Sequence, residues 1–292
     1  MGGLTLLLVI SAWALFGAAG IGGALVIVGL LAFLTPRVGP AMVLRFYRAW
    51  PIEPREAPQI FRILRGLAQR AELPEFPKLY YIASSNMNAF AVGRPDNSAI
   101  TVTDGLLRGL NLRQLTGVLA HEVSHIANED IKVMGLADVV SRLTGIMQSI
   151  GFMLLLFGIW QGGGAIIAAI VLMLAPTIGT FLQRALSRSR EYDADLAAAH
   201  LTGDPVGLAA ALKIMQRRQG SLWESILLPG GRIPDPSLLR THPKPKDRIA
   251  RLLELEAKHL PEVETRESQV HLPAGFRPVH QRPRFHASGL WY

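Results

Sequence analysis

Residues 120–130 read A-H-E-V-S-H-I-A-N-E-D, and the interpretation of the whole chain begins from this stretch. On a helix, residues four apart point from the same face, so His121 and His125 can present their imidazoles to one metal ion. Zn²⁺ takes histidine nitrogens at about 2.0–2.1 Å. Glu122 can then reach a water in the open metal position and act as general base. The alternative is an ordinary helix with three polar residues at this spacing by chance.

The composition divides the chain into two membrane-like blocks and two polar regions. Of 292 residues, 50% are hydrophobic and only 18% are charged, against about 25% charged in average soluble domains. Residues 1–36 and 143–183 contain no charged side chain. Because the chain has no cysteine, disulfides and thiolate metal sites are excluded. Any bound metal must be held by His, Asp or Glu.

The net charge of +8 is concentrated beside the uncharged blocks rather than in a nucleic-acid-binding patch. Arginines follow the first block and flank the second, as at the cytoplasmic ends of membrane spans. We therefore expect a lipid bilayer as a partner and no nucleic acid. These arginines are Arg37, Arg45, Arg48, Arg142, Arg184, Arg188 and Arg190.

Residues 4–35 form the first apolar run. One helix of this length would extend roughly 48 Å, longer than the ~30 Å hydrocarbon core. A hairpin turning at Gly20–Gly23 would instead have two arms of about 13 residues each. Both arrangements remain open. Because no Lys or Arg precedes the run, it is interpreted as a retained anchor and not a cleaved signal peptide.

Two further apolar runs, 143–160 and 165–183, are separated by Q-G-G-G. Charged residues flank the outer ends and not the glycine turn, which predicts a transmembrane hairpin with both ends in the cytoplasm. A buried hairpin in a soluble protein is the alternative. A membrane hairpin would return the chain to the surface that it left, with the two ligand helices continuing its two arms.

The third metal ligand is expected in S-R-S-R-E-Y-D-A-D, residues 187–195. Glu191 and Asp195 are four apart on a predicted helix, so Glu191 can bind the metal while Asp195 orients a ligand histidine. The alternative is a solvated acidic face that pairs with Arg188 and Arg190. Antiparallel arms would bring Glu191 back to His121 and His125 beside the cytoplasmic face of the membrane.

The polar regions predict a small α+β domain. Periodicity predicts an amphipathic helix over 55–72, a strand over 78–84 and a β-hairpin over 88–105. Asn111 and Gln114 predict a capping box at the start of the helix that carries the H-E-x-x-H motif. The second polar region should be helical to about residue 260, before a poorly ordered tail.

Four motifs together resemble the HtpX family of bacterial membrane zinc metalloproteases, relatives of the CaaX prenyl endoproteases. They are N-A-F-A-V-G, H-E-V-S-H-I-A-N-E-D, S-R-S-R-E-Y-D-A-D and T-H-P-K-P-K-D-R-I, in that order. The resemblance covers about residues 55–255. It implies a gluzincin-like catalytic domain, zinc bound by His121, His125 and Glu191, and Glu122 as catalytic base. Family members usually have two separate N-terminal spans, where this chain has one merged run.

The resemblance also gives roles to two further segments. In zincin-like proteases a strand edge pairs with the substrate backbone, and the candidate comprises Asn88, Ala89, Phe90 and Ala91. By similarity to the prenyl endoproteases, His242 donates a hydrogen bond to the developing oxyanion and Arg248 supports the site. Without the resemblance, a core hairpin is an equal alternative for the strand, and His242 would be interpreted as a loop residue.

We therefore expect an α+β, predominantly helical integral membrane protein with a transmembrane hairpin inserted between its metal ligands. The expected activity is endopeptidase cleavage of misfolded or membrane-associated proteins in the cell inner membrane, in stress-related quality control, with one Zn²⁺ per chain and a cytoplasmic catalytic domain. Two alternatives are a processing protease for lipidated C-termini and a non-catalytic zinc-binding scaffold. The expected segments are an anchor (1–36), two catalytic parts (37–142 and 184–262), the hairpin (143–183) and a flexible tail (263–292).

Overall fold

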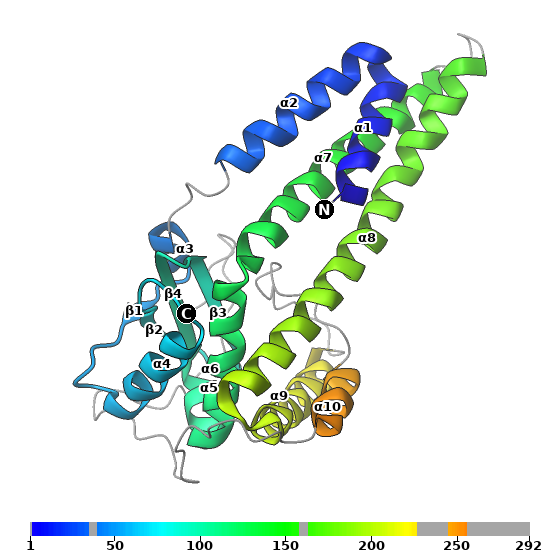
Figure 1. The fold of residues 1–292 in the computed structure, drawn as a ribbon. Coiled ribbons are helices and arrows are strands. Elements are labelled where there is room, and N and C mark those ends of the chain that lie inside the picture. The colour runs from blue at the N-terminus through cyan, green and yellow to red at the C-terminus, as the bar shows by residue number, and fades with distance from the viewer. Residues whose placement is uncertain (1, 35–39, 158–162, 227–244, 256–292) are drawn as a thin grey trace. The chain divides into compact units, whose positions relative to one another are not determined.

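The computed structural model describes residues 2–34, 40–157, 163–226 and 245–255 (Figure 1). The chain forms two compact units, each built from two separate segments. One unit contains Met1–Val38 and Lys132–Ser189, and the other contains Gly39–Ile131 and Arg190–Tyr292. We call them the apolar unit and the catalytic unit. His242 and the predicted tail, 263–292, lie outside the described residues.

The N-terminal run of the apolar unit is a helical hairpin, not one long helix. Helix α1 (Gly2–Phe16) and helix α2 (Ala18–Leu34) are joined at Gly17, three residues before the Gly20–Gly23 turn considered above. Gly17 has φ of 60°, which glycine adopts without a steric penalty. The helices approach so closely that a Cβ on Gly20 would lie 2.1 Å from the carbonyl oxygen of Ala12. Glycine at both positions therefore permits the reversal.

Two longer helices also contribute to the apolar unit. Helix α7 (Asp130–Phe157) and helix α8 (Gly163–Thr202) contain segments long and apolar enough to cross a membrane. A Cβ on Gly151 of α7 would lie 2.7 Å from Cβ of Leu172 of α8, so glycine allows these backbones to approach closely, as at many membrane helix interfaces. Large apolar side chains cover the outer surfaces, among them Ile146, Phe152, Met153, Ile167, Leu174 and Phe181.

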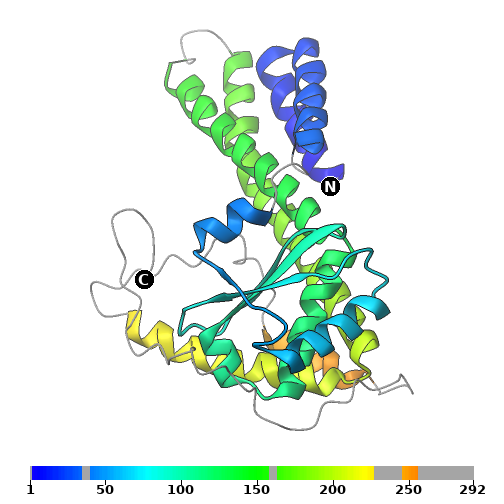
Figure 2. The same ribbon diagram turned by 90° about the vertical axis from the view of Figure 1, so that its left-hand side faces the viewer.

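The catalytic unit contains a four-stranded sheet in the order β1-β2-β4-β3 (Figure 2). Its strands are β1 (Trp50–Pro51), β2 (Lys78–Ile82), β3 (Ala89–Arg94) and β4 (Asn97–Thr103). Strand β4 pairs in parallel with β2 and antiparallel with β3. The hairpin predicted for 88–105 is confirmed, and β3 forms one edge of the sheet.

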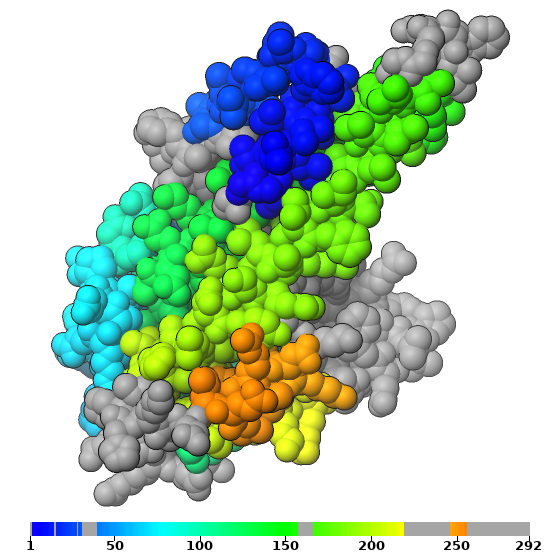
Figure 3. All heavy atoms as spheres, turned by 45° about the vertical axis from the view of Figure 1, so that its right-hand side comes forward, coloured from blue at the N-terminus to red at the C-terminus, as the bar shows by residue number. Residues whose placement is uncertain are grey.

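Alternate side chains of a strand point to opposite faces of the sheet. Apolar side chains are buried on both faces here, and helices pack against each of them. One face packs on helix α4 (Pro58–Arg70) and helix α6 (Leu112–Ala127), while helix α3 (Pro40–Phe46) covers part of the other face. Helix α5 (Asp104–Gly109) follows β4 directly. Helix α10 (Pro245–Glu254) lies against helix α9 (Pro205–Ile226), as the surface in Figure 3 shows.

The beginning of α6 is fixed by the predicted capping box. Asn111 Oδ1 accepts a hydrogen bond from the backbone N–H of Gln114 at 2.9 Å, and Gln114 Oε1 accepts one from the backbone N–H of Asn111 at 3.0 Å. Two amide groups that the helix itself leaves unpaired are satisfied in this way. The capping box therefore fixes the residue at which the helix with the H-E-x-x-H motif begins.

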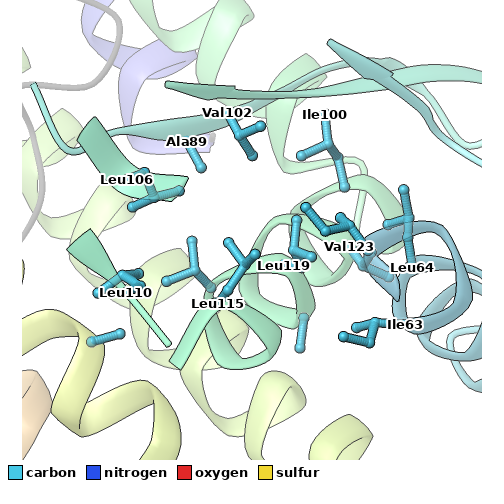
Figure 4. Close-up of a cluster of buried hydrophobic side chains, with 14 of the residues drawn as sticks. Ile63, Leu64, Ala89, Ile100, Val102, Leu106, Leu110, Leu115, Leu119 and Val123 are labelled. Carbon is cyan, nitrogen blue, oxygen red and sulfur yellow. The ribbon is translucent and has the colours of Figure 1, made fainter. Parts of the chain in front are cut away.

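A single apolar stripe orients α6 against the sheet (Figure 4). Leu115, Leu119 and Val123 are spaced by four residues and fully buried, and they pack in one cluster with Ile100 and Val102 of β4. Burying each leucine contributes roughly 1.5–3 kcal/mol. Because His121 and His125 lie on the other side of the helix, burial of this stripe turns both imidazoles away from the sheet.

We expect Leu119→Ala to lower the free energy of unfolding by about 2–5 kcal/mol, because it leaves a cavity between α6 and the sheet. Leu253→Ala, at a position that is 59% exposed on α10, is the matched control. Thermal unfolding of the detergent-solubilised protein checks the difference. Equal melting temperatures for the two variants would show that the stripe does not hold α6.

Candidate metal centre

His121 and His125 face each other from adjacent turns of α6. Their Nε2 atoms are 3.1 Å apart and their ring planes are inclined at 82°. Both side chains are largely enclosed by the protein. The i, i+4 spacing therefore brings the two nitrogen atoms to a common point, as the motif predicts.

Glu191, on α8, completes a three-residue group. Its Oε2 lies 3.4 Å from Nε2 of His121, and its Oε1 lies 3.6 Å from Nε2 of His125. Ligands at about 2.0–2.1 Å from a tetrahedral zinc ion are themselves about 3.3–3.4 Å apart. The distance from Nε2 of His121 to Nε2 of His125 and its distance to Oε2 of Glu191 are close to that value. One donor atom from each of the three residues lies within 4.8 Å of the other two, so the group can hold one metal ion.

The other nitrogen of each imidazole is held by a carboxylate. His121 Nδ1 lies 3.1 Å from Oδ1 of Asp195, and His125 Nδ1 lies 2.9 Å from Oδ2 of Asp130. A proton on each Nδ1 can be donated to its carboxylate, which leaves the Nε2 lone pairs directed at the shared point. Carboxylates behind metal-binding histidines orient the rings in this way and raise their basicity. This pairing is the strongest indication that the group fits a metal ion.

Asp130 was missed by the sequence reasoning. It lies five residues after His125, outside the i, i+4 rule, because α6 ends at Ala127 and Asp130 begins α7. Between them, Glu129 has φ of 52°, an uncommon conformation that breaks the helix. The prediction that the motif helix continues into the first apolar arm is therefore wrong, and the break is what brings the Asp130 carboxylate back to His125. The N-E-D sequence after the motif was the available signal.

Two arginines balance the buried carboxylates. Arg248, on α10, donates two hydrogen bonds to Asp195, at 2.7 and 2.6 Å, and its Nη1 lies 2.9 Å from Oε2 of Glu191. Arg190 Nη1 lies 3.2 Å from Oδ1 of Asp130. Arg248 is only 5% exposed, so its guanidinium is committed to these acids. Removing it would leave buried, uncompensated negative charge.

The surrounding acids also govern protonation. Burial and Arg248 lower the pKa of His121, but its hydrogen bonds with Asp195 and Glu191 outweigh them and raise the pKa to about 9. Burial likewise lowers the pKa of Arg248, but Asp195, Glu191 and Glu122 outweigh it and raise that pKa. The two neighbouring carboxylates therefore favour the positively charged form of His121. Glu122, itself 8% exposed, contributes to the same electrostatic environment.

The predicted substrate strand lies beside the metal helix. Strand β3 packs against α6 and, within the described part of the chain, pairs only with β4. The backbone N–H of Thr103 donates to the carbonyl of Asn88 at 3.1 Å, so hydrogen-bonded pairs recur at every second residue from Asn88. The backbone groups of Phe90 therefore face β4, and those of Ala89 and Ala91 face the open edge.

The arrangement defines a class of protein: metal-dependent peptidases with an H-E-x-x-H helix. Family comparison agrees with this class. The model of Peptidase family M48 matches residues 54–256, and the chain belongs to that family. The protein is accordingly a metalloprotease, and the resemblance to HtpX proteases found in the sequence is confirmed.

Curated relatives are similar over most of their length. A "Protease HtpX homolog" of Acaryochloris marina is 38% identical over 273 residues, which span 88% of this chain and 92% of that one. Homologues with the same name from Aquifex aeolicus and Burkholderia thailandensis are 38% and 35% identical. The match to the Aquifex protein covers 83% of this chain and 86% of that protein. The match to the Burkholderia protein covers 87% of this chain and 94% of that protein. With its long apolar helices, the chain is thus a membrane protease of the HtpX type.

The fold is similar to that of a solved structure. The crystal structure of S. mikatae Ste24p matches with a TM-score of 0.53 and 21% sequence identity, over 86% of this chain. The match spans 63% of the Ste24p chain, so Ste24p has a substantial part without a counterpart here. At this identity the similarity concerns the fold alone.

We expect Asp130→Asn to weaken metal binding about 10- to 100-fold, because the amide cannot replace the carboxylate that orients His125. Asp193→Asn is the matched control, since Asp193 is exposed on α8 between Glu191 and Asp195. Competition between the purified protein and a chromogenic chelator measures the affinity without relying on turnover. Identical affinities would remove Asp130 from the metal site.

Proposed function

We propose that the protein is a zinc endopeptidase that hydrolyses peptide bonds of misfolded or membrane-associated proteins at the cytoplasmic face of a membrane. The observation that carries this proposal is the spacing of His121, His125 and Glu191, with a carboxylate behind each imidazole. The donor set of two imidazoles and one carboxylate, which leaves a position open, suits zinc better than other common divalent ions. Within the described part of the chain this is the one such group, which supports the proposal of one Zn²⁺ per chain.

Glu122 is the proposed general base. It follows His121 on α6, where a water approaching the metal position comes within its reach. Zinc in this position would supply Lewis acidity, which makes the water more acidic and polarises the scissile carbonyl. Glu122 accepts the proton of the attacking water and then donates it to the leaving amine, so that its carboxylate is restored after each turnover.

Positioning and transition-state roles are divided among the remaining residues. Asp195 and Asp130 hold the imidazoles, and Arg248 holds Asp195 and Glu191. We keep His242 as the proposed hydrogen-bond donor to the oxyanion, a role that requires an N–H directed at the developing charge. Because Arg248 is occupied by two carboxylates, it supports the site indirectly, which leaves the oxyanion to another donor.

The open edge of β3 is the proposed substrate platform. An extended peptide can add to this edge through backbone hydrogen bonds, which provide affinity with little sequence preference. That property suits an enzyme that removes damaged proteins of many sequences. Ala89 and Ala91 would make these bonds, while Asn88 and Phe90 hold the strand on β4.

The membrane topology follows from the distribution of charge. Arginines flank the hairpin 143–183 and follow the anchor 1–36, which by the positive-inside rule places the catalytic parts, 37–142 and 184–262, in the cytoplasm. A bacterial inner membrane is the corresponding location for a chain of this type. Quality control of membrane proteins is the proposed role. The alternative is processing of lipidated C-termini, which the resemblance to prenyl endoproteases supports.

We expect Glu122→Gln to retain zinc but to cleave casein about 10²- to 10⁴-fold more slowly, because the general base is lost. Glu72→Gln, at an exposed position after α4, should behave as wild type. Chelation should abolish wild-type cleavage and zinc should restore it.

Two outcomes of this experiment would contradict the proposal. Retained cleavage by Glu122→Gln would remove this residue from the base role, and zinc binding without any wild-type turnover would favour the scaffold alternative. Cleavage of a farnesylated peptide in preference to an unfolded membrane protein would favour the processing protease.

We expect Ala91→Pro to raise KM about 3- to 10-fold, because it removes an N–H donor from the open edge, and one hydrogen bond contributes about 0.5–1.5 kcal/mol. Its thermal stability should change little, since proline is tolerated where the N–H faces outward on an edge strand. Phe90→Pro, which removes a bond to β4, should instead destabilise the protein. An unchanged KM for Ala91→Pro would mean that the substrate does not pair with β3.

A further inference from the structure

A short segment at the start of the catalytic unit exposes three large apolar side chains that the proposed mechanism does not use. Met42, Phe46 and Trp50 are 72%, 61% and 66% exposed. Met42 and Phe46 are four apart on α3 and share one face. Trp50 follows at the beginning of β1, where it pairs with Tyr81. We call these three side chains the α3 patch.

The opposite face of the same segment is firmly packed. Leu44 is buried with Phe90, Val92 and Ala99 of β3 and β4. The ring of Tyr47 lies 5.3 Å from that of Phe90, and the ring of Phe46 lies 5.2 Å from that of Tyr47. The α3 patch is therefore displayed from a rigid base, and the exposure of its side chains does not come from a frayed end.

From Arg37 to Ile52, every charged residue of the chain is an arginine. Arg45 and Arg48 are both exposed within the segment, Arg37 precedes it, and the first acidic residue of the chain is Glu53. Arginines beside exposed aromatic and apolar side chains complement a surface whose outer layer is anionic and whose inner layer is apolar. An anionic phospholipid bilayer has this layered chemistry.

The length of the chain limits where α3 can lie. Only five residues separate Leu34, at the end of the apolar helix α2, from Pro40, at the start of α3. Six residue steps span at most about 20 Å when fully extended. With α2 in the hydrocarbon core, α3 must begin within this distance of the lipid boundary. Phe and Trp on a segment so close to a span match the aromatic belt of membrane proteins.

We propose that the α3 patch inserts into the interfacial layer of an anionic phospholipid bilayer, with Arg45 and Arg48 at the headgroup phosphates. The contact does not depend on catalysis. Because Tyr47 packs on Phe90 of β3, the same segment joins the lipid surface to the proposed substrate strand. If the proposed function holds, substrates that emerge from the membrane surface are the class that this arrangement favours.

The absence of cysteine permits a direct test. Single variants Met42→Cys, Phe46→Cys and Trp50→Cys are labelled with bimane in full-length Glu122→Gln protein, so that catalysis plays no part. The protein is reconstituted in vesicles of phosphatidylcholine with or without phosphatidylglycerol, with brominated lipid as quencher. Phe76→Cys is the matched control, because Phe76 is an exposed aromatic residue, 51% accessible, elsewhere on the catalytic unit.

We expect brominated lipid to quench the three α3 labels at least about twofold more than the label at position 76. Quenching should fall when Arg45 and Arg48 are both replaced by Glu, or when phosphatidylglycerol is omitted, because the headgroup attraction is lost. Equal quenching at all four positions would overturn the proposal. A second result would also overturn it. If a label is shielded from water but not quenched by lipid, and the shielding increases with protein density, the segment contacts a second copy of the protein instead of lipid.

A second measurement addresses the substrate class separately. In protein with intact Glu122, Met42→Ser combined with Phe46→Ser should slow cleavage of a bilayer-inserted substrate about fivefold or more, and leave casein cleavage unchanged. Phe76→Ser is the control. Lipid quenching without this selective loss would overturn the link to substrate choice but not the lipid contact. Failure of casein cleavage by the wild type would instead count against the proposed function.

Discussion

The whole site depends on keeping two imidazole lone pairs directed at one point inside a protein. Burial alone would favour any arrangement in which the ring nitrogens find hydrogen-bond partners. Asp195 and Asp130 remove that freedom, because each binds the Nδ1 side of one ring and leaves Nε2 for a cation. The two carboxylates come from different helices, α8 and α7, so the fold must bring three helices together before the histidines are oriented.

That requirement concentrates negative charge, and the structure shows how it is tolerated. Glu191 and Asp195 share the Arg248 guanidinium, and Asp130 is paired with Arg190. Breaking a buried pair of this kind by removing one partner is strongly destabilising. Arg248 therefore stabilises the fold around the site by pairing with both acids. This compensating charge comes from α10, the last described helix.

The sequence contained most of the site because the relevant distances follow from helix periodicity. His121 and His125, and then Glu191 and Asp195, are pairs at i and i+4, and the capping box at Asn111 was equally local. Asp130 escaped because it lies beyond the helix break at Glu129, where the i, i+4 rule no longer applies. The turn at Gly17 escaped for a similar reason: in a run that is apolar on all sides, no change of periodicity marks where a helix ends. The meeting of Glu191 with the histidines needed a topological argument, since 66 residues separate it from His125.

The donor atoms of the centre are nitrogen and oxygen only, in a chain without a single thiol. Zinc sites built from thiolates lose their ion when peroxide or disulfide stress oxidises the sulfur. Imidazoles and carboxylates do not undergo that chemistry. Peroxide or disulfide stress therefore finds no sulfur to oxidise among the coordinating groups of this centre.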